Sequence, residues 1–180
     1  MAVDEGDIVD ILSSIKNDAH SADPYKASQS AMGLLTSLGR NQWADARDEI
    51  IHTSKRNHNA FKLIDSALFV LVLDDYVPQS KHDLASNMLH GSYKLQKTVI
   101  KVDDDDSLEE HEYQAGTCSN RWYDKLQIIV CGDGTAGINF EHASIDGHTA
   151  LRFVSDIYAE SVVKFARYVP WDNIWNLVVS

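Results

Sequence analysis

The feature that most constrains the fold is the stretch Gln127–Ile157, in which two strand-like runs precede a histidine and then a helical pattern. Gln127–Cys131 and Ala136–Phe140 are short apolar runs, and Gly132-Asp133-Gly134 lies between them. Glycine supplies the positive φ that a tight turn needs, so this order predicts a β-hairpin. We expect its second strand to end at Glu141-His142.

A histidine with a carboxylate behind it follows this hairpin. Asp146-Gly147 comes four residues after His142, and helical spacing of apolar residues begins from His148. A histidine where a strand opens into a turn is held at the edge of a cleft, which general-base chemistry requires. An unperturbed imidazole titrates at about 6.5, and a carboxylate at Asp146 would hold its tautomer. A purely structural strand-end contact fits the same spacing, so both interpretations stay open.

Composition narrows the class of protein. A length of 180 residues with 44% hydrophobic and 24% charged residues predicts one globular domain. The net charge of −11 argues against a nucleic-acid partner and gives no reason to expect an anionic membrane surface. No apolar run reaches the roughly 18 residues of a membrane span. Two cysteines, Cys118 and Cys131, are too few for a disulfide framework and indicate a reducing, intracellular compartment.

The remaining elements follow from periodicity and turn residues. Residues 21–30 are polar and contain Pro24, which indicates a loop. Leu68–Leu73 is a continuous apolar run and predicts a strand buried on both faces, although periodicity alone does not exclude a helix. Leu84, Met88 and Leu89 are expected to face inward. Amphipathic spacing predicts helices over residues 4–19, 40–52, 59–66 and 81–90, the last capped by Gly91.

Residues 101–113 carry four consecutive aspartates and three glutamates. Carboxylates suit a calcium ion, but the run has neither the glycine nor the alternating ligands of an EF-hand loop. Acidic blocks repel themselves, so a solvated surface loop is the favoured interpretation.

Other motifs have competing explanations. Residues 132–137 form a GxGxxG pattern, but a dinucleotide site needs a helix to start there, and Asp133-Gly134 favours a hairpin turn. His142, Asp146 and His148 together have no recognised metal-ligand spacing, so no metal is expected. Cys131 lies within a strand, which favours an inert buried thiol over a nucleophile. The run 120–125 is either a capped turn with core aromatics, which is favoured, or places Arg121 beside Glu141 or Asp146.

Several segments together resemble the choline/carnitine acyltransferase family, most closely its carnitine acetyltransferases. The resemblance covers roughly residues 33–168. The segments that carry it are N-R-W-Y-D-K-L-Q at 120–127, D-G-T-A-G-I-N-F-E-H at 133–142 and D-G-H-T-A-L-R-F at 146–153, with Gly33-Leu34-Leu35-Thr36-Ser37, Trp43-Ala44-x-Ala46-Arg47, Leu68–Tyr76 and Asn87–Gly91 upstream in the family's order.

The resemblance implies a fold and a reaction. Members of the family have an α/β fold, with a mixed sheet and packed helices of the chloramphenicol-acetyltransferase-like kind. Their general base is the histidine that aligns with His142, and the acid that aligns with Asp146 orients it. The base deprotonates the hydroxyl of carnitine, or the thiol of coenzyme A in reverse, for direct attack on the acyl carbonyl. The implied substrates are acyl-CoA and carnitine, with coenzyme A as co-substrate, no cofactor, and a mitochondrial or peroxisomal location, although no targeting signal is seen in this chain.

The chain also departs from the family. Members are several times longer, and the later segments that bind coenzyme A and carnitine have no counterpart in residues 1–180. We therefore expect a partial domain that carries the catalytic histidine, with sheet edges left uncovered and prone to self-association. The alternative is a truncated, non-catalytic remnant or an interaction module.

Overall fold

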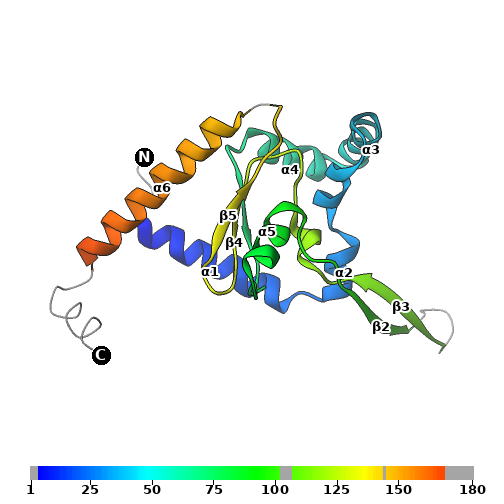
Figure 1. The fold of residues 1–180 in the computed structure, drawn as a ribbon. Coiled ribbons are helices and arrows are strands. Elements are labelled where there is room, and N and C mark those ends of the chain that lie inside the picture. Colours follow the sequence, from blue (N-terminus) through cyan, green and yellow to red (C-terminus); the bar gives the residue numbers. More distant parts are fainter. Residues whose placement is uncertain (1–3, 102–106, 144, 169–180) are drawn as a thin grey trace. The chain divides into compact units, whose positions relative to one another are not determined.

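The computed structural model describes residues 4–101, 107–143 and 145–168. Its architecture is mixed α/β, with helices and a mixed sheet, as the sequence predicts (Figure 1). The chain divides into two compact units, Met1–Phe140 and Glu141–Ser180, and each is described by itself.

The first unit contains most of the secondary structure. Its helices are α1 (Glu5–Ser21), α2 (Pro24–Gln29), α3 (Arg40–Thr53), α4 (Lys55–Ser66) and α5 (Lys81–His90), with short 3-10 helices η1 (Met32–Ser37) and η2 (Thr117–Asn120). Its strands are β1 (Val70–Leu73), β2 (Leu95–Lys101), β3 (Leu108–Gln114), β4 (Gln127–Val130) and β5 (Ala136–Asn139). The second unit contains α6 (Gly147–Tyr168).

A three-stranded sheet lies at the centre of the first unit, in the order β1-β4-β5. β1 is parallel to β4, and β4 is antiparallel to β5, so the predicted hairpin is confirmed. Its turn uses Gly134 at φ +84°, and Asp133 Oδ1 accepts a hydrogen bond from the Thr135 amide at 3.0 Å. Because β5 continues through the GxGxxG pattern as a strand, no helix begins in that loop to receive a pyrophosphate.

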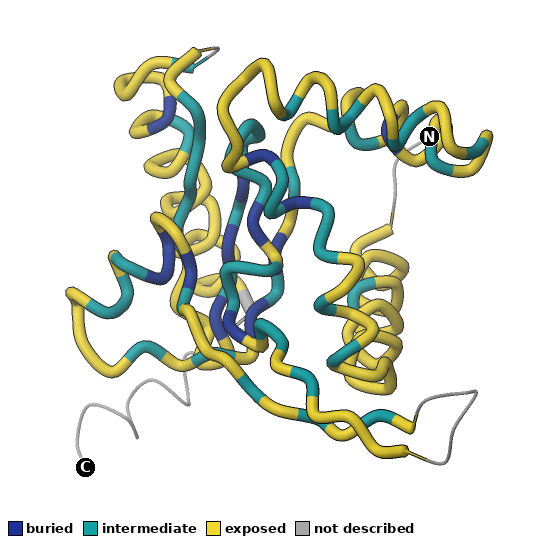
Figure 2. The backbone as a smooth tube through the Cα atoms, turned by 90° about the vertical axis from the view of Figure 1, so that its right-hand side faces the viewer, coloured by how far each residue is buried: buried dark blue, intermediate teal, exposed yellow. Residues whose placement is uncertain are grey.

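The apolar core joins this sheet to α5. Val72 of β1, Met88 of α5, and Ile129 and Cys131 of the hairpin are buried together. The tube in Figure 2 shows the buried residues concentrated along the central strands. Gly137 makes the approach possible, since a Cβ there would lie 2.8 Å from Met88 Sδ.

An aromatic cluster packs beside this core and holds α3 and α4. The Phe61 ring lies 6.1 Å from Trp43 and 6.5 Å from Trp122, measured between ring centroids. The Arg47 guanidinium stands 5.6 Å over the Phe61 ring, in cation–π geometry. Trp122 is half-buried in this cluster beside the core, so the favoured interpretation, in which the aromatics of the run 120–125 enter the core, is confirmed only in part.

The acidic segment contains more structure than a surface loop. Residues 108–114 form β3, which pairs antiparallel with β2, so the prediction of a loop through Tyr113 is wrong there. Cross-strand charge pairing gives the physical reason: Lys97 of β2 contacts Glu110 and Glu112, which offsets the repulsion among the acids. The aspartate run at 103–106 lies outside the described residues.

Two further predictions were wrong in the first half of the chain. The segment 21–30 contains α2 because Asp23 accepts hydrogen bonds from the Tyr25 and Lys26 amides, and Pro24 occupies the first helical position. The apolar run 68–73 is not buried on both faces. The strand starts only at Val70, and the Leu68 and Leu71 side chains are 89% and 37% exposed.

One of the three residues of α5 that were predicted to face inward does not do so. Leu84 and Met88 face the core, but Leu89 is exposed. Leu89 lies about 100° around the helix from Met88, and the polar Asn87 is buried on the other side instead. Ser80 caps the start of α5, and Gly91, at φ +76°, ends it as predicted.

None of the described helices combines the length and the apolar character needed to cross a bilayer.

Candidate functional site

The hairpin that leads to His142 is anchored at its end. Asn139, the last residue of β5, donates its side-chain amide to the Leu89 carbonyl at 2.7 Å. The strand therefore stops three residues before His142, and the prediction that it ends at Glu141-His142 is wrong by this margin. Asn139 still pairs with Gln127 of β4, and its side-chain bond to the C-terminal turn of α5 adds a second anchor where the strand ends.

His142 lies in the turn between β5 and α6, and its side chain is exposed. An exposed imidazole on a short connection remains accessible to a substrate, which a base must be. The turn, rather than the strand, therefore positions this ring.

Asp146 is the N-cap of α6. Its Oδ1 accepts a hydrogen bond from the Thr149 amide at 2.7 Å, and its carbonyl accepts one from the Ala150 amide at 3.1 Å. Hydrogen bonds from the Thr149 amide and hydroxyl lower the pKa of Asp146, and attraction to His142 lowers it further. The carboxylate is thus held ionised, at a helix start and within electrostatic reach of His142.

Arg121 does not pair with a carboxylate near His142. It is fully buried and forms a two-pronged ion pair with Asp74, with Nη2 2.8 Å from Oδ2 and Nη1 3.3 Å from Oδ1. The alternative in which it reaches Glu141 or Asp146 is therefore wrong. Asp74 directly follows β1, so the pair ties this strand to the loop that precedes β4.

A buried hydrogen-bond network that the sequence analysis did not identify surrounds this ion pair. Asn87 donates to Asp74 at 3.1 Å and accepts from the Thr117 hydroxyl at 2.6 Å, and its carbonyl accepts from Arg121 at 2.8 Å. The only available signal was the polar Asn87 on the apolar face of a predicted helix. The network fixes α5, η2 and β1 relative to one another.

The two cysteines are poor nucleophiles for a covalent mechanism. Cys131 is buried at the end of β4 and lies 3.6 Å from the Asn87 side-chain nitrogen. Burial raises the pKa of the Cys118 thiol, which reduces the fraction present as the reactive thiolate.

Among the residues that the structure describes, no set of three or more histidine, cysteine or acidic side chains is arranged to hold a metal ion.

Comparison with known proteins identifies the family. The family model described as choline/carnitine O-acyltransferase matches residues 2–171. A Saccharomyces cerevisiae protein, provisionally named a mitochondrial carnitine O-acetyltransferase, is 44% identical over 161 residues, which are 88% of this chain and 22% of that protein. A second carnitine O-acetyltransferase of that yeast is 34% identical, over 83% of this chain and 18% of its own length. Mitochondrial carnitine O-palmitoyltransferase 2 of Xenopus tropicalis is 35% identical, over 79% and 18%.

This chain belongs to the choline/carnitine O-acyltransferase family. It spans about a fifth of the length of the curated relatives it matches.

Proposed function

We propose that this chain supplies the general base for acyl transfer between acyl-CoA and carnitine, with His142 as the base and Asp146 as its supporting carboxylate. The observation that carries the proposal is the exposed His142 in the turn before α6, with the ionised N-cap Asp146 within electrostatic reach. Family membership and the names of the relatives support the class of reaction.

The proposed step is a proton transfer coupled to direct attack. The His142 imidazole takes the proton of the carnitine hydroxyl, and the oxygen forms a bond to the acyl carbonyl carbon. The bond from that carbon to the coenzyme A sulfur then breaks, and the protonated imidazole returns the proton to the thiolate. In the reverse direction the thiol loses its proton to the same ring, so one base serves both directions.

Asp146 would act on the ring and not on the substrate. A carboxylate beside an imidazole stabilises the charged form that exists between the two proton transfers. Its hydrogen bonds with Thr149 hold it in place, so the charge does not need to reorganise during the reaction.

Proximity and stabilisation of the developing oxyanion would supply the rest of the rate, with the substrate's own trimethylammonium group contributing. The proposal requires coenzyme A as co-substrate and no prosthetic group. The relatives named as mitochondrial support a mitochondrial location for this activity.

A chimera provides the test, because this chain spans only part of the family's length. The matching 161-residue segment of the 44% identical yeast relative is replaced by the corresponding residues of this chain. His142→Ala in the chimera should lower kcat for acetyl transfer to carnitine by about 10²- to 10⁴-fold, the usual contribution of a general base. His148→Ala is the matched control, since His148 is also exposed and lies only six residues away.

The control should retain activity within about threefold, a change far smaller than the loss expected when a general base is removed. Equal losses in both variants, or an active His142→Ala chimera, would remove His142 from the mechanism.

A further inference from the structure

The last two carbonyl groups of α5 accept hydrogen bonds from side chains outside the helix. The final carbonyls of a helix have no amide partner within it, and they carry the negative end of its dipole. Asn139 Nδ2 donates to the Leu89 carbonyl at 2.7 Å, and the Tyr123 hydroxyl donates to the His90 carbonyl at 2.8 Å. Two equivalent bonds therefore reach neighbouring carbonyls from two different segments of the chain.

Asn139 lies where β5 and the first unit end. It is the last residue of β5 and is the partner of Gln127 in the final pair of the ladder with β4, and the first unit ends one residue later at Phe140. Gly137 also lies against α5, because a Cβ there would be 2.8 Å from Met88 Sδ. The strand is thus held on α5 twice, by close packing at Gly137 and by a hydrogen bond at its final residue.

The bond from Asn139 restrains the part of the strand that pairing holds least. Hydrogen-bonded elements open most readily at their ends, and β5 has only four residues. A side-chain bond to a helix opposes this opening. Only Phe140 and Glu141 separate Asn139 from His142, so a displacement of the strand end is passed to the imidazole through two residues of chain.

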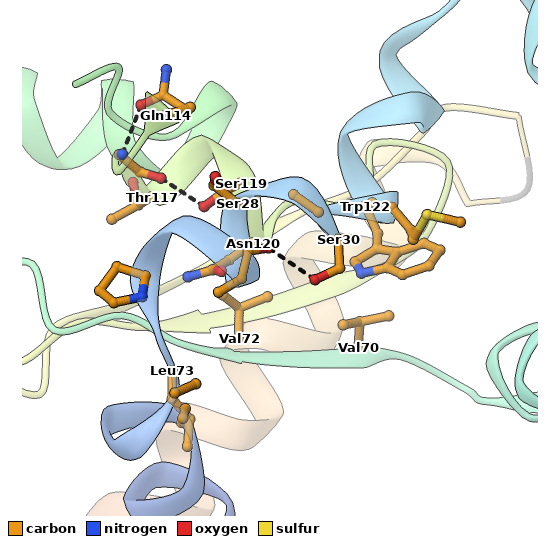
Figure 3. A pocket seen from close by; sticks show the side chains of 18 of the residues that line it. Ser28, Ser30, Val70, Val72, Leu73, Gln114, Thr117, Ser119, Asn120 and Trp122 are labelled. Carbon is orange, nitrogen blue, oxygen red and sulfur yellow. Dashed lines mark hydrogen bonds between the residues drawn. The ribbon is translucent and has the colours of Figure 1, made fainter. Parts of the chain in front are cut away.

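A groove beside β1 does not explain this bond. The groove has a volume of about 1340 Å³, and Figure 3 shows Val70 and Val72 of β1 and the ring of Trp122 around it. The described residues that line it include none from α5 or β5. Substitution of Asn139 therefore leaves the lining of the groove unchanged.

We propose that Asn139 is a positioning residue for His142, whose bond to the Leu89 carbonyl fixes the strand end from which the chain leads to the imidazole. This inference rests on the proposed function of His142 as the general base. Asn139 itself takes no proton and touches no reacting atom. A base must lie within hydrogen-bond reach of the proton that it removes, and a misplacement of about 1 Å can lower the rate by about 10²-fold.

The test uses the chimera described above and two substitutions of Asn139. Asn139→Leu keeps a side chain of similar size but removes the donor. Asn139→His supplies a ring N–H, with Nδ1 the same number of bonds from the Cα as Nδ2 of asparagine. Asn139→Leu should lower kcat for acetyl transfer by about 10- to 100-fold, with KM for carnitine changed by no more than about threefold. Asn139→His should recover most of the lost kcat.

Tyr123→Phe is the matched control. It removes the bond to the His90 carbonyl, next to Leu89, and leaves β5 unchanged. Its kcat should stay within about threefold of the unsubstituted chimera, a change far smaller than the loss expected from a misplaced base. A loss in Tyr123→Phe as large as that in Asn139→Leu would overturn the proposal, because any weakening of the end of α5 would then lower activity.

A double-mutant cycle with His142→Ala distinguishes positioning of the base from general damage. If Asn139 acts through the imidazole, Asn139→Leu should lower kcat by no more than about twofold once His142 is alanine. A loss of the same size with and without His142 would assign Asn139 a purely structural role and overturn the proposal.

The same variants distinguish failure of this inference from failure of the proposed function. Loss of activity in His142→Ala together with full activity in Asn139→Leu would remove the positioning role and leave the base in place. Full activity in His142→Ala would overturn both, because there would be no base for Asn139 to position.

Discussion

Arg121 is the largest fully buried side chain among the described residues. Its side chain is fully buried against Asp74, whose side chain is also fully buried. Two charges taken out of water are costly unless each is paired and hydrogen-bonded, and Asn87 supplies the additional bonds. The Arg121 Nε remains without a partner in the described structure, so the network is close to complete but not fully satisfied.

Removal of the buried guanidinium should be strongly destabilising. Arg121→Leu leaves Asp74 as an uncompensated buried charge, and we expect a loss of about 3–5 kcal/mol in the free energy of unfolding. The matched control is Arg152→Leu, because Arg152 forms an exposed i,i+4 pair with Asp156. That change should cost no more than about 0.5 kcal/mol.

Urea denaturation followed by tryptophan fluorescence measures both variants. Similar losses for Arg121→Leu and Arg152→Leu would mean that the buried pair contributes no more than a surface pair.

The sequence alone indicated that Arg121 could pair with a carboxylate, but it did not identify Asp74 as the partner. From its neighbours in sequence alone, an aspartate that follows an apolar run is expected to be a surface group. Its burial depends on the parallel pairing of β1 with β4, which are more than 50 residues apart in sequence. The exposure of Leu89 was missed for a related reason, since only the packed structure shows which face of α5 contacts the sheet.

At the scale of elements, two glycines with positive φ mark the end of α5 and the turn of the β4–β5 hairpin. Gly91 closes α5 at φ +76°, and a Cβ there would lie 2.5 Å from the Cys118 backbone nitrogen. Gly134 in the hairpin turn has a similar φ of +84°, but a Cβ there would meet no atom within 4 Å. A comparison of the two positions therefore distinguishes the cost of a positive φ alone from the added cost of a steric clash.

Gly91→Ala should destabilise the protein more than Gly134→Ala. Both substitutions place a side chain at positive φ, at a cost of the order of 1–3 kcal/mol. Only Gly91→Ala adds a clash with backbone, which cannot be relieved by rotation of a side chain. The difference between the two midpoints of urea unfolding measures this clash, and equal midpoints would show that it relaxes without cost.

The start of α6 should respond to acid through Asp146. Its pKa is lowered in the folded chain by the hydrogen bonds with Thr149. A carboxylate with a lowered pKa contributes stability that is fully present above its unfolded value, near 4, and is lost as the pH falls through the folded pKa. The Thr149 amide resonance should therefore titrate with a midpoint below about 3.9.

Asp146→Asn provides the comparison for this titration. Asparagine is an equally good N-cap but carries no charge, so α6 should persist and the titration should disappear. A midpoint at or above the ordinary aspartate value would contradict the geometry of the cap.

Element types were predictable from local patterns, and their burial was not. The hairpin, α5 with its glycine cap, and the helix after His148 follow from turn residues and helical spacing. The short helix α2 was missed because its start depends on a single cap at Asp23 followed by Pro24. The exposure of one face of β1 at Leu71 could not be predicted, because an apolar run is the same whether its second face is covered or open.

For the whole molecule, the site could be predicted only in part. The spacing between His142 and Asp146 is a local property and was visible in the sequence. Lys16 and His20 of α1 contact Asp75 just after β1, and no local pattern shows a contact between segments so far apart in the sequence.

The 180-residue chain on its own should show little exchange between acetyl-CoA and carnitine, because it spans about a fifth of the family's length. Release of free thiol from acetyl-CoA, followed with a chromogenic thiol reagent, should not rise above background when carnitine is added. Carnitine-dependent release by the isolated chain, lost in His142→Ala, would show that the remaining family length is not needed for the chemistry.

The most direct measurement of the central claim is the pH dependence of the defect caused by His142→Ala in the chimera, in the direction from acetylcarnitine to acetyl-CoA. A free thiol ionises near pH 8.5 without assistance, and only the thiolate attacks. If His142 removes the thiol proton, the loss in kcat at pH 7 should shrink by roughly tenfold or more at pH 9.5, where the thiol is already ionised. A loss of the same size at both pH values would contradict a role for His142 as the base.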